Sequence, residues 1–305
     1  MKLKIWAVLM LMAFTPPAEK DRIAAIGSLN ADQKKIYLPG EDFEPINKPS
    51  TGDWLDVHRE PGQTFEQYVK EGFIRPDKKR HTIYLLPIGK FAPGRSPSLK
   101  ALRECAEAYF MMKVKVQKPI PVEGHDFTTR INPYTKNRQI LTHDVLKLLK
   151  KLLPKDAFCI LAITMEDLYP DPSWNFVFGM ASLYERVGVF SFARYDPAFY
   201  GEKRGKDYKQ ILLRRSCKVL THEAVHMFGI GHCIYFQCGM CGSNHLDESD
   251  ARPIHLCPVC LRKLQHNLGF DPVARYRKLK QFYSKYGLEP EASWVGARLK
   301  NITGK

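Results

Sequence analysis

The residues with the clearest capacity for chemistry in this 305-residue chain are three histidines and a glutamate in the run HEAVHMFGIGH, residues 222–232. Five specified residues at the spacing H-E-x-x-H-x-x-G-x-x-H rarely occur together by chance. His222 and His226 are four positions apart, so on a helix both imidazoles project from one face and can bind the same ion. Gly229 lets the chain leave the helix and bring His232 to a third ligand position. The pattern predicts a zinc ion held by three histidine nitrogens, with a fourth coordination position open to water.

Glu223 is the residue of this run that a purely structural zinc site does not need. It lies beside the first histidine and can reach a zinc-bound water without binding the metal, so we interpret it as the general base. Zinc lowers the pKa of its water to about 7, and a neighbouring carboxylate can then take the proton as the oxygen attacks a carbonyl and pass it to the leaving amine. This chemistry is peptide hydrolysis without a covalent intermediate. A structural zinc helix, or a surface helix with incidental histidines, is the alternative that Glu223 argues against.

Five of the eight cysteines form a second group just after the histidines. They are Cys233, Cys238, Cys241, Cys257 and Cys260. Spacing alone favours two C-x-x-C pairs, 238–241 and 257–260, as a four-cysteine zinc site, and disulfides are the competing interpretation in an exported protein. An odd number of cysteines does not pair off, so we favour zinc. The other three lie in apolar segments and are predicted to be core residues: Cys105, Cys159 and Cys217.

The elements that must position these groups alternate between apolar strand-like runs and amphipathic helices, which predicts a mixed α/β sheet. The best helix covers residues 210–228, because it has no Gly or Pro and is followed by Gly229, the residue type favoured just past a helix. The other predicted helices are residues 98–111, 141–153, 257–268 and 271–286. The predicted strands are residues 82–88, 112–116, 157–165, 175–182 and 187–193.

Composition excludes several classes of protein. With 44% hydrophobic and 11% aromatic residues the chain can bury a sizeable core, so wholesale disorder is excluded. The net charge is 47 − 32 = +15, but the basic residues are spread along the chain and no nucleic-acid-binding motif is present, so nucleic-acid binding is not favoured. The longest apolar run, residues 5–14, is far shorter than the ~20 residues of a membrane-spanning helix. A polytopic membrane protein is therefore excluded.

The amino terminus leaves the compartment open. Lys2 and Lys4, the apolar run and the sequence Thr-Pro-Pro-Ala over residues 15–18 resemble a short signal segment, yet a small-x-small cleavage site is missing. A frayed first helix of a cytoplasmic protein is the other interpretation, and we favour it slightly over export.

The distribution of Pro and Gly residues and the apolar periodicity divide the chain into three parts. Residues 1–75 are predicted to be an amino-terminal extension, with a possible signal segment over residues 1–18 and an irregular stretch over residues 19–75, where many Pro and Gly residues occur. Residues 76–285 form the predicted catalytic domain, which includes the cysteine-rich segment 233–260. Residues 286–305 are predicted to be a polar tail.

The sequence resembles the archaemetzincin (archaelysin) family, a branch of the metzincin zinc peptidases. The motif over residues 222–232 carries the resemblance together with Cys233, Cys238-Gly239-Met240 and Cys257-Pro258-Val259-Cys260. Further segments are similar to animal archaemetzincins, and the resemblance runs from about residue 80 to 285. These segments are residues 167–170, 174–179, 190–195 and 242–246.

The resemblance implies a fold, a reaction and two zinc ions per chain. The fold is an α/β (α+β) metzincin-type domain with a twisted mixed sheet, an active-site helix and a methionine turn, at Met240 in this chain, beneath the metal. The three histidines bind the catalytic zinc, the glutamate is the base, and the substrate is a peptide or protein. The implied ligands of the structural zinc are Cys233, Cys238, Cys257 and Cys260. The family pattern has no cysteine directly after the methionine. The resemblance therefore leaves Cys241 out of the zinc site, whereas the spacing argument includes it.

Two other functions stay open at this point. One is a zinc-stabilised binding protein that retains the site, turns over little and uses its basic surface to hold an acidic partner. The other is nucleic-acid binding by the cysteine segment, which would weaken steeply with salt. Cleavage preference, the choice between endopeptidase and aminopeptidase, and the oligomeric state are not specified by the motif.

Overall fold

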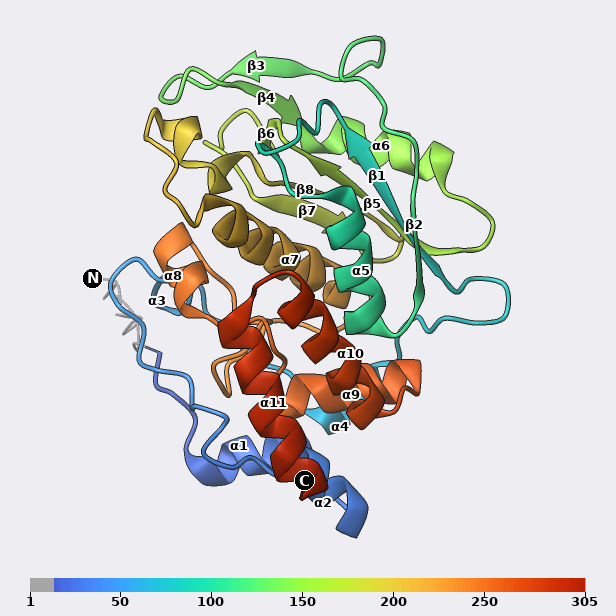
Figure 1. Cartoon of the computed structure of the whole chain (residues 1–305), viewed down its shortest axis with the longest axis vertical. Coiled ribbons are helices and arrows are strands. Elements are labelled where there is room, and N and C mark those ends of the chain that lie inside the picture. The colour runs from blue at the N-terminus through green and yellow to red at the C-terminus, as the bar shows by residue number, and fades with distance from the viewer. Residues whose placement is uncertain (1–13, 305) are drawn as a thin grey trace, which may run out of the picture.

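The computed structural model describes residues 14–304 of the chain. Its main sheet is twisted and has five strands (Figure 1). The strands run in the order β2-β1-β5-β8-β7; β7 lies at one edge and is antiparallel to β8, whereas the other neighbours are parallel. All five strands were predicted, although β7 begins later than expected. Their bounds are β1 Thr82–Ile88, β2 Lys113–Val116, β5 Ala157–Thr164, β7 Gly179–Ser182 and β8 Val187–Ser191.

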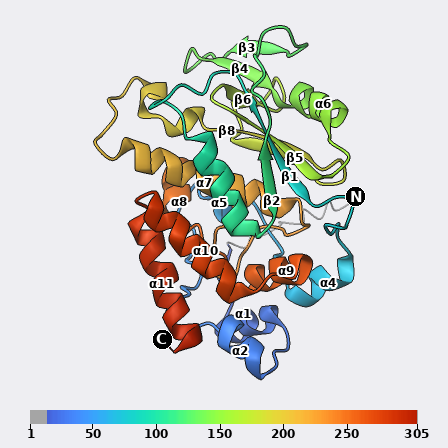
Figure 2. The same cartoon turned by 45° about the vertical axis from the view of Figure 1, so that its right-hand side comes forward.

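Helices pack on both faces of this sheet, which gives three layers and agrees with the predicted mixed α/β fold. On one face, α5 (Leu99–Phe110) and α7 (Tyr208–His226) join the larger hydrophobic cluster. On the other face, α6 (Thr142–Leu152) contributes Val145 and Leu149 to a smaller cluster. Figure 2 shows α6 and α7 on opposite sides of the sheet. Ser98 caps α5 by accepting a hydrogen bond from the Ala101 N–H, as its Ser start suggested.

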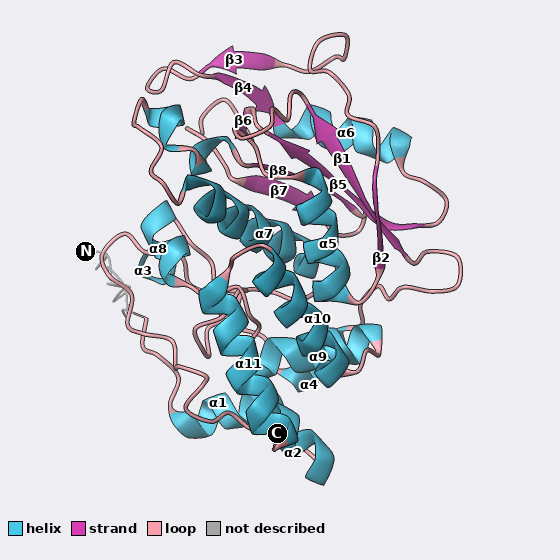
Figure 3. Cartoon of the chain, in the orientation of Figure 1, coloured by secondary structure: helices cyan, strands magenta, loops and turns pink. Residues whose placement is uncertain are grey.

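A second, three-stranded sheet lies at the top of the molecule in Figure 3 and was missed in the sequence. Its order is β3-β4-β6, with β3–β4 antiparallel and β4–β6 parallel. Each of these short strands includes a charged side chain, so none of them forms the apolar run that marked the central strands. Their bounds are β3 Thr129–Ile131, β4 Arg138–Leu141 and β6 Asp167–Tyr169.

The carboxyl-terminal part is a set of helices below α7. The predicted helices are present as α9 (Pro258–Leu268) and α10 (Pro272–Lys285), and a short α8 (Leu246–Ala251) precedes them. The prediction of a polar tail over residues 286–305 is wrong in its structure, because α11 (Glu289–Thr303) forms there and packs on α10. Only a few buried positions, such as Val295, hold this helix, so its overall composition stays polar.

Over residues 19–75 the amino-terminal extension contains four short helices and packs against the core, so the prediction that this stretch is irregular is wrong. Its helices are α1 Glu19–Ile26, α2 Ala31–Tyr37, α3 Trp54–Val57 and α4 Phe65–Glu71. Reciprocal caps at Asn30 and Thr64 start α2 and α4, which makes such short helices stable between breakers. Tyr37 and Tyr68 are buried in the larger hydrophobic cluster. The described part of the extension thereby belongs to the same core as α5 and α7.

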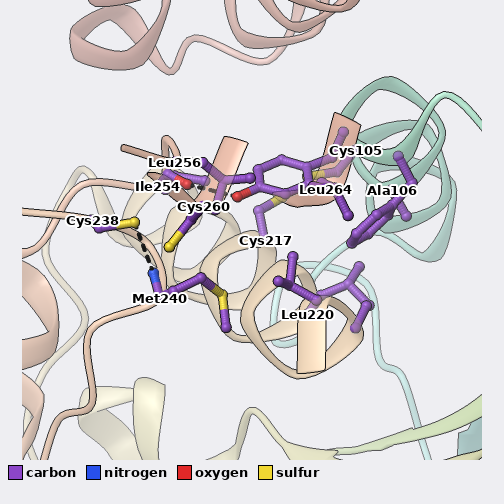
Figure 4. Close-up of a cluster of buried hydrophobic side chains, with 14 of the residues drawn as sticks. Cys105, Ala106, Cys217, Leu220, Cys238, Met240, Ile254, Leu256, Cys260 and Leu264 are labelled. Atoms are coloured by element: carbon purple, nitrogen blue, oxygen red, sulfur yellow. Dashed lines mark hydrogen bonds between the residues drawn. The ribbon is translucent and has the colours of Figure 1, made fainter. Parts of the chain in front are cut away.

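Cys105, Cys159 and Cys217 are fully buried in the larger hydrophobic cluster, so the prediction that they are core residues is confirmed. Figure 4 shows Cys105 and Cys217 among apolar side chains, near Cys260. All eight cysteines lie in the described part of the chain and none is in a disulfide. Within residues 14–304, no helix is both long and apolar enough to cross a membrane. Most of the candidate signal segment, residues 1–18, lies outside the described residues.

Candidate active site

Helix α7 and the turn after it bring the three predicted histidines together. His222 and His226 lie one turn apart on α7, and their ring centroids are 4.7 Å apart. Gly229 adopts a φ of 77°, a left-handed conformation that favours glycine. The chain therefore turns back, and the His232 ring lies 5.3 Å from His222 and 5.1 Å from His226. One ring nitrogen from each histidine lies within 4.8 Å of the other two.

Hydrogen bonds at the far side of the rings determine which nitrogens are free to bind a metal. Nδ1 of His222 donates to the Gly239 carbonyl at 2.8 Å, and Nδ1 of His226 donates to the Ile230 carbonyl at 2.8 Å. A carbonyl only accepts, so Nε2 carries the lone pair in both neutral rings. Burial lowers the pKa of both histidines, that of His226 to about 4. Their Nε2 atoms are 3.1 Å apart, and two lone pairs at that distance repel unless a cation lies between them. This donor set fits a zinc ion.

Glu60 from the amino-terminal extension holds the third histidine, and sequence reasoning missed it. Its Oε1 lies 2.8 Å from Nδ1 of His232 and also accepts a hydrogen bond of 2.9 Å from the Trp54 indole. The hydrogen bond with His232 lowers the pKa of Glu60. A carboxylate on Nδ1 directs the Nε2 lone pair toward a metal and makes it a stronger ligand. The two residues are 172 positions apart, so no local pattern could have shown the pair.

We expect Glu60→Gln to weaken zinc binding by about 10- to 100-fold, because an amide cannot raise the basicity of the His232 ring as a carboxylate does. Competition with a fluorescent zinc chelator measures the affinity directly. Glu41→Gln, at an exposed position of the same extension, is the matched control and should bind zinc like the wild type. Equal zinc affinity in the Glu60 variant and the control would contradict this role.

Gly239 supports the first histidine through its backbone. Its carbonyl accepts the His222 hydrogen bond, and its N–H donates to the His255 carbonyl at 2.8 Å. A Cβ at this position would lie 2.6 Å from the backbone oxygen of Ile254, which cannot move aside as a side chain would. The next residue, Met240, is fully buried, and its N–H donates to Sγ of Cys238 (Figure 4). This turn therefore connects the histidines with the cysteine group.

We expect Gly239→Ala to destabilise the fold by roughly 1–3 kcal/mol, the usual cost of overpacking, and to weaken zinc binding because the His222 acceptor is displaced. Urea unfolding and zinc titration give the two quantities. Gly231→Ala is the control, since a Cβ there meets nothing within 4 Å. If both variants unfolded at the wild-type urea concentration, the predicted clash with the Ile254 backbone would be refuted.

Glu223 shares a cavity of about 620 Å³ with the three histidines. Its carboxyl carbon lies 3.5 Å from where a Cβ on Gly179 would stand, so it faces the edge strand β7. Burial raises the pKa of Glu223 to about 7. Within the described part of the chain its carboxylate has no hydrogen bond or ion pair, and it is open to the cavity. The arrangement places a carboxylate beside the histidine nitrogens but outside their ligand set.

The cysteine group contains Cys233 and excludes Cys241. The sulfurs of four buried cysteines lie within 4.8 Å of one another. They belong to Cys233, Cys238, Cys257 and Cys260. Sγ of Cys238 also accepts the N–H groups of Met240 at 3.4 Å and Cys257 at 3.2 Å, and such donors stabilise a thiolate. Cys241 instead donates to the Phe236 carbonyl at 3.3 Å. The structure thus groups the set implied by the family resemblance, rather than the set favoured by spacing.

Comparison with known proteins decides the family. A model of Peptidase family M54 matches residues 111–266. Archaemetzincin-2 of Mus musculus is 43% identical over 289 residues, which cover 84% of this chain and 80% of the relative. Archaemetzincin-2 of Homo sapiens is 43% identical over 283 residues, covering 82% and 79%. The chain belongs to the archaemetzincin family. A crystal structure of archaemetzincin from Methanopyrus kandleri is 29% identical, with a TM-score of 0.49, and covers 65% of this chain and 100% of that one.

Family membership confirms the resemblance seen in the sequence and places the chain in a family of zinc metallopeptidases, which implies peptide or protein substrates. Three of the archaemetzincin-like segments meet at Arg194. This buried guanidinium pairs with Asp167 at 2.8 Å and stacks over the Phe176 ring at 3.5 Å. A buried pair of this kind needs both partners, since either charge alone would be costly. Arg194 thereby ties the small sheet, through Asp167, to the segment that leads into β7, through Phe176.

Proposed function

We propose that this archaemetzincin hydrolyses peptide bonds at the three-histidine site, with zinc held by His222, His226 and His232 and with Glu223 as the general base. The observation that carries the proposal is the convergence of unprotonated ring nitrogens on one cavity that Glu223 also faces. Zinc bound there supplies Lewis acidity, which acidifies water and polarises a peptide carbonyl. The histidines act as neutral donors, and each has its Nδ1 held by a carbonyl or a carboxylate.

Glu223 has the proton-transfer role in this proposal. Its carboxylate accepts a proton from the attacking water and returns that proton to the nitrogen of the departing amine. The residue can do both because it lies beside the ligands without being one of them, and because no other described residue binds its oxygens.

The edge strand β7 is proposed to orient the substrate. It pairs with β8 along one side, and among the described strands none pairs with its other side. Residues Phe178 to Ala181 line the cavity. An extended peptide can add to such an edge through backbone hydrogen bonds, which hold it independently of its side chains. The scissile bond would then lie next to Gly179, opposite Glu223.

We further propose that the four grouped cysteines hold a second, structural zinc ion, which gives two zinc ions per chain. Four protein ligands fill a tetrahedral zinc site and leave no position for water, so this site would support the fold and take no part in hydrolysis.

The test of the function is mass spectrometry of a peptide mixture incubated with the protein in three forms: zinc-loaded, stripped by a chelator, and reloaded. Cleavage by the loaded and reloaded forms alone would support the proposal. Internal cleavage sites would assign an endopeptidase, and removal of single amino-terminal residues an aminopeptidase. Peptides that bind to the loaded form without being cut would contradict the proposal and favour a zinc-stabilised binding protein.

A further inference from the structure

Two buried cations, Lys218 and Arg252, line the same cavity as the three histidines. Lys218 lies one helical turn, about 5.4 Å, before His222 on α7, so both side chains project from the same side. Arg252 directly follows α8. Only 6% of Lys218 and 8% of Arg252 is exposed. A buried charge is costly unless another group compensates it. The hydrogen bonds and ion pairs around the two side chains show how far the protein provides that compensation.

The hydrogen-bond partners of Lys218 are neutral. Its Nζ donates to the carbonyls of Ser249 and Arg252 at the carboxyl end of α8. An ammonium has three N–H donors, so one donor remains. Within residues 14–304, no carboxylate oxygen lies within 4.0 Å of Nζ of Lys218, so the side chain forms no ion pair there. Burial lowers the pKa of Lys218 to about 7, and Arg214 acts in the same direction, so that together they outweigh the opposite effect of Asp250, Cys241 and Glu291. An anion at this position would stabilise the charged form.

Arg252 has partners for only part of its guanidinium. One terminal nitrogen donates to Gln237, and the other lies 3.5 Å from Glu248. Its Nε is buried and has no hydrogen-bond partner. Glu248 is itself shared, because it also accepts the backbone N–H groups of Trp54 and Asn244.

Two further carboxylates act on Lys218 from a distance: Asp250 pairs with Arg215 at 2.6 Å, and Glu291 pairs with Arg214 at 2.5 Å. Glu223 shares the cavity but, within the described residues, forms no ion pair with either cation. Positive charge is left at the wall of the cavity, close to the catalytic histidines.

We propose that Lys218 and Arg252 form a subsite that binds a carboxylate of the peptide substrate close to the scissile bond. This inference rests on the proposed function, since it names the class of peptide that the same site prefers. The carboxylate is either an acidic side chain or the free carboxyl terminus. Both have the chemistry that an ammonium and a guanidinium recognise.

The contrasting explanation gives Lys218 a structural role alone, in which its hydrogen bonds hold the end of α8 against α7. A structural role predicts the same effect on every substrate, whereas a subsite predicts discrimination between a carboxylate and an amide. The experiment therefore compares the ratio of the cleavage rates of acid and amide peptides.

The first measurement uses zinc-loaded wild-type protein and peptides built around one cleaved bond, with Glu or Gln at each neighbouring position and a free or amidated terminus. A charged hydrogen bond is worth about a 10- to 100-fold difference in kcat/KM, and we expect that preference for Glu over Gln at one position. A preference only for the free terminus would assign the carboxyl terminus as the source. Equal rates for acid and amide in both arms would overturn the subsite.

Variants then separate the subsite from a structural role. In Lys218→Met the acid-to-amide ratio should fall toward 1, and Lys218→Arg should retain it. Lys263→Met is the matched control, because Lys263 is also buried and also donates to a backbone carbonyl, that of Gln63, but is not part of the cavity wall. A wild-type ratio in folded Lys218→Met would contradict the proposal, and if that variant does not fold, the wild-type and Lys218→Arg ratios decide.

If the wild type cuts no peptide, the proposed function has failed but the subsite is still tested. Fluorescein-labelled Glu and Gln peptides are then compared for binding to the zinc-loaded protein by anisotropy. Tighter binding of the acid by about 10-fold or more supports the subsite, and equal binding overturns it.

Discussion

Glu223→Gln should lower kcat for peptide hydrolysis by about 10²- to 10⁴-fold, the usual contribution of a general base. Glutamine has nearly the same size and shape, so the α7 helix and the cavity are preserved. Its amide nitrogen cannot accept a proton, and its amide oxygen is too weak a base to take one from water. Because Glu223 lies outside the group of converging histidine nitrogens, the variant should still bind zinc.

The measurement is kcat and KM on a peptide that the wild type cleaves, together with zinc content and thermal unfolding. Glu202→Gln, at an exposed position of the loop before α7, is the control for the loss of one negative charge. A folded, zinc-loaded Glu223 variant with wild-type kcat would show that another group accepts the proton. Loss of zinc along with activity would instead place Glu223 among the ligands.

The active-site helix and its histidines were predictable because all the information is local. The stretch before Gly229 has no breaker, the histidines recur at helical spacing, and the glycine at the end adopts the positive φ that its type allows. The buried strands were equally clear, since β5 is a continuous apolar run and is buried at every position.

The groups that complete the site could not be predicted in the same way. Glu60 and Trp54 come from a segment full of Pro and Gly, and they reach His232 only because the extension folds against the core. In the sequence Lys218 is one of several basic residues of a charged helix, and only the folded chain shows that its Nζ donates to a carbonyl of α8. Each of these contacts joins parts of the chain that are distant in sequence, and neither periodicity nor composition carries that information.

The identity of the fourth cysteine illustrates the same limit. A pair of C-x-x-C motifs has regular spacing, and this favoured Cys241 over Cys233. In the folded chain Cys233 follows the third histidine directly, and its N–H donates to the Met240 carbonyl at 2.8 Å. Sγ of Cys233 lies 3.5 Å from Sγ of Cys257, whereas Cys241 lies outside the group of four and donates to the Phe236 carbonyl at 3.3 Å. The path of the folded backbone therefore decides the grouping, and the spacing in the sequence does not show it.

Substituting two neighbouring cysteines should separate the zinc site from ordinary burial. Cys257→Ser removes one sulfur from the group of four, so the variant should lose one of two zinc equivalents. Its free energy of unfolding should fall by on the order of 5 kcal/mol or more, because binding to structural zinc sites contributes about 10–16 kcal/mol. Cys241→Ser should keep both zinc ions and lose about 1 kcal/mol, since a hydroxyl can donate to the Phe236 carbonyl as the thiol does.

The comparison is decisive because both cysteines are buried in the same segment and the chemical change is the same. Equilibrium unfolding and zinc content by mass spectrometry of the native protein give the two quantities for each variant. If Cys241→Ser lost the zinc and Cys257→Ser kept it, the ligand set would be the one that spacing favoured. If both variants kept the wild-type zinc content and lost the same stability, the four sulfurs would be a packed core cluster, because only a metal makes one thiol of this segment far more costly to replace than its neighbour.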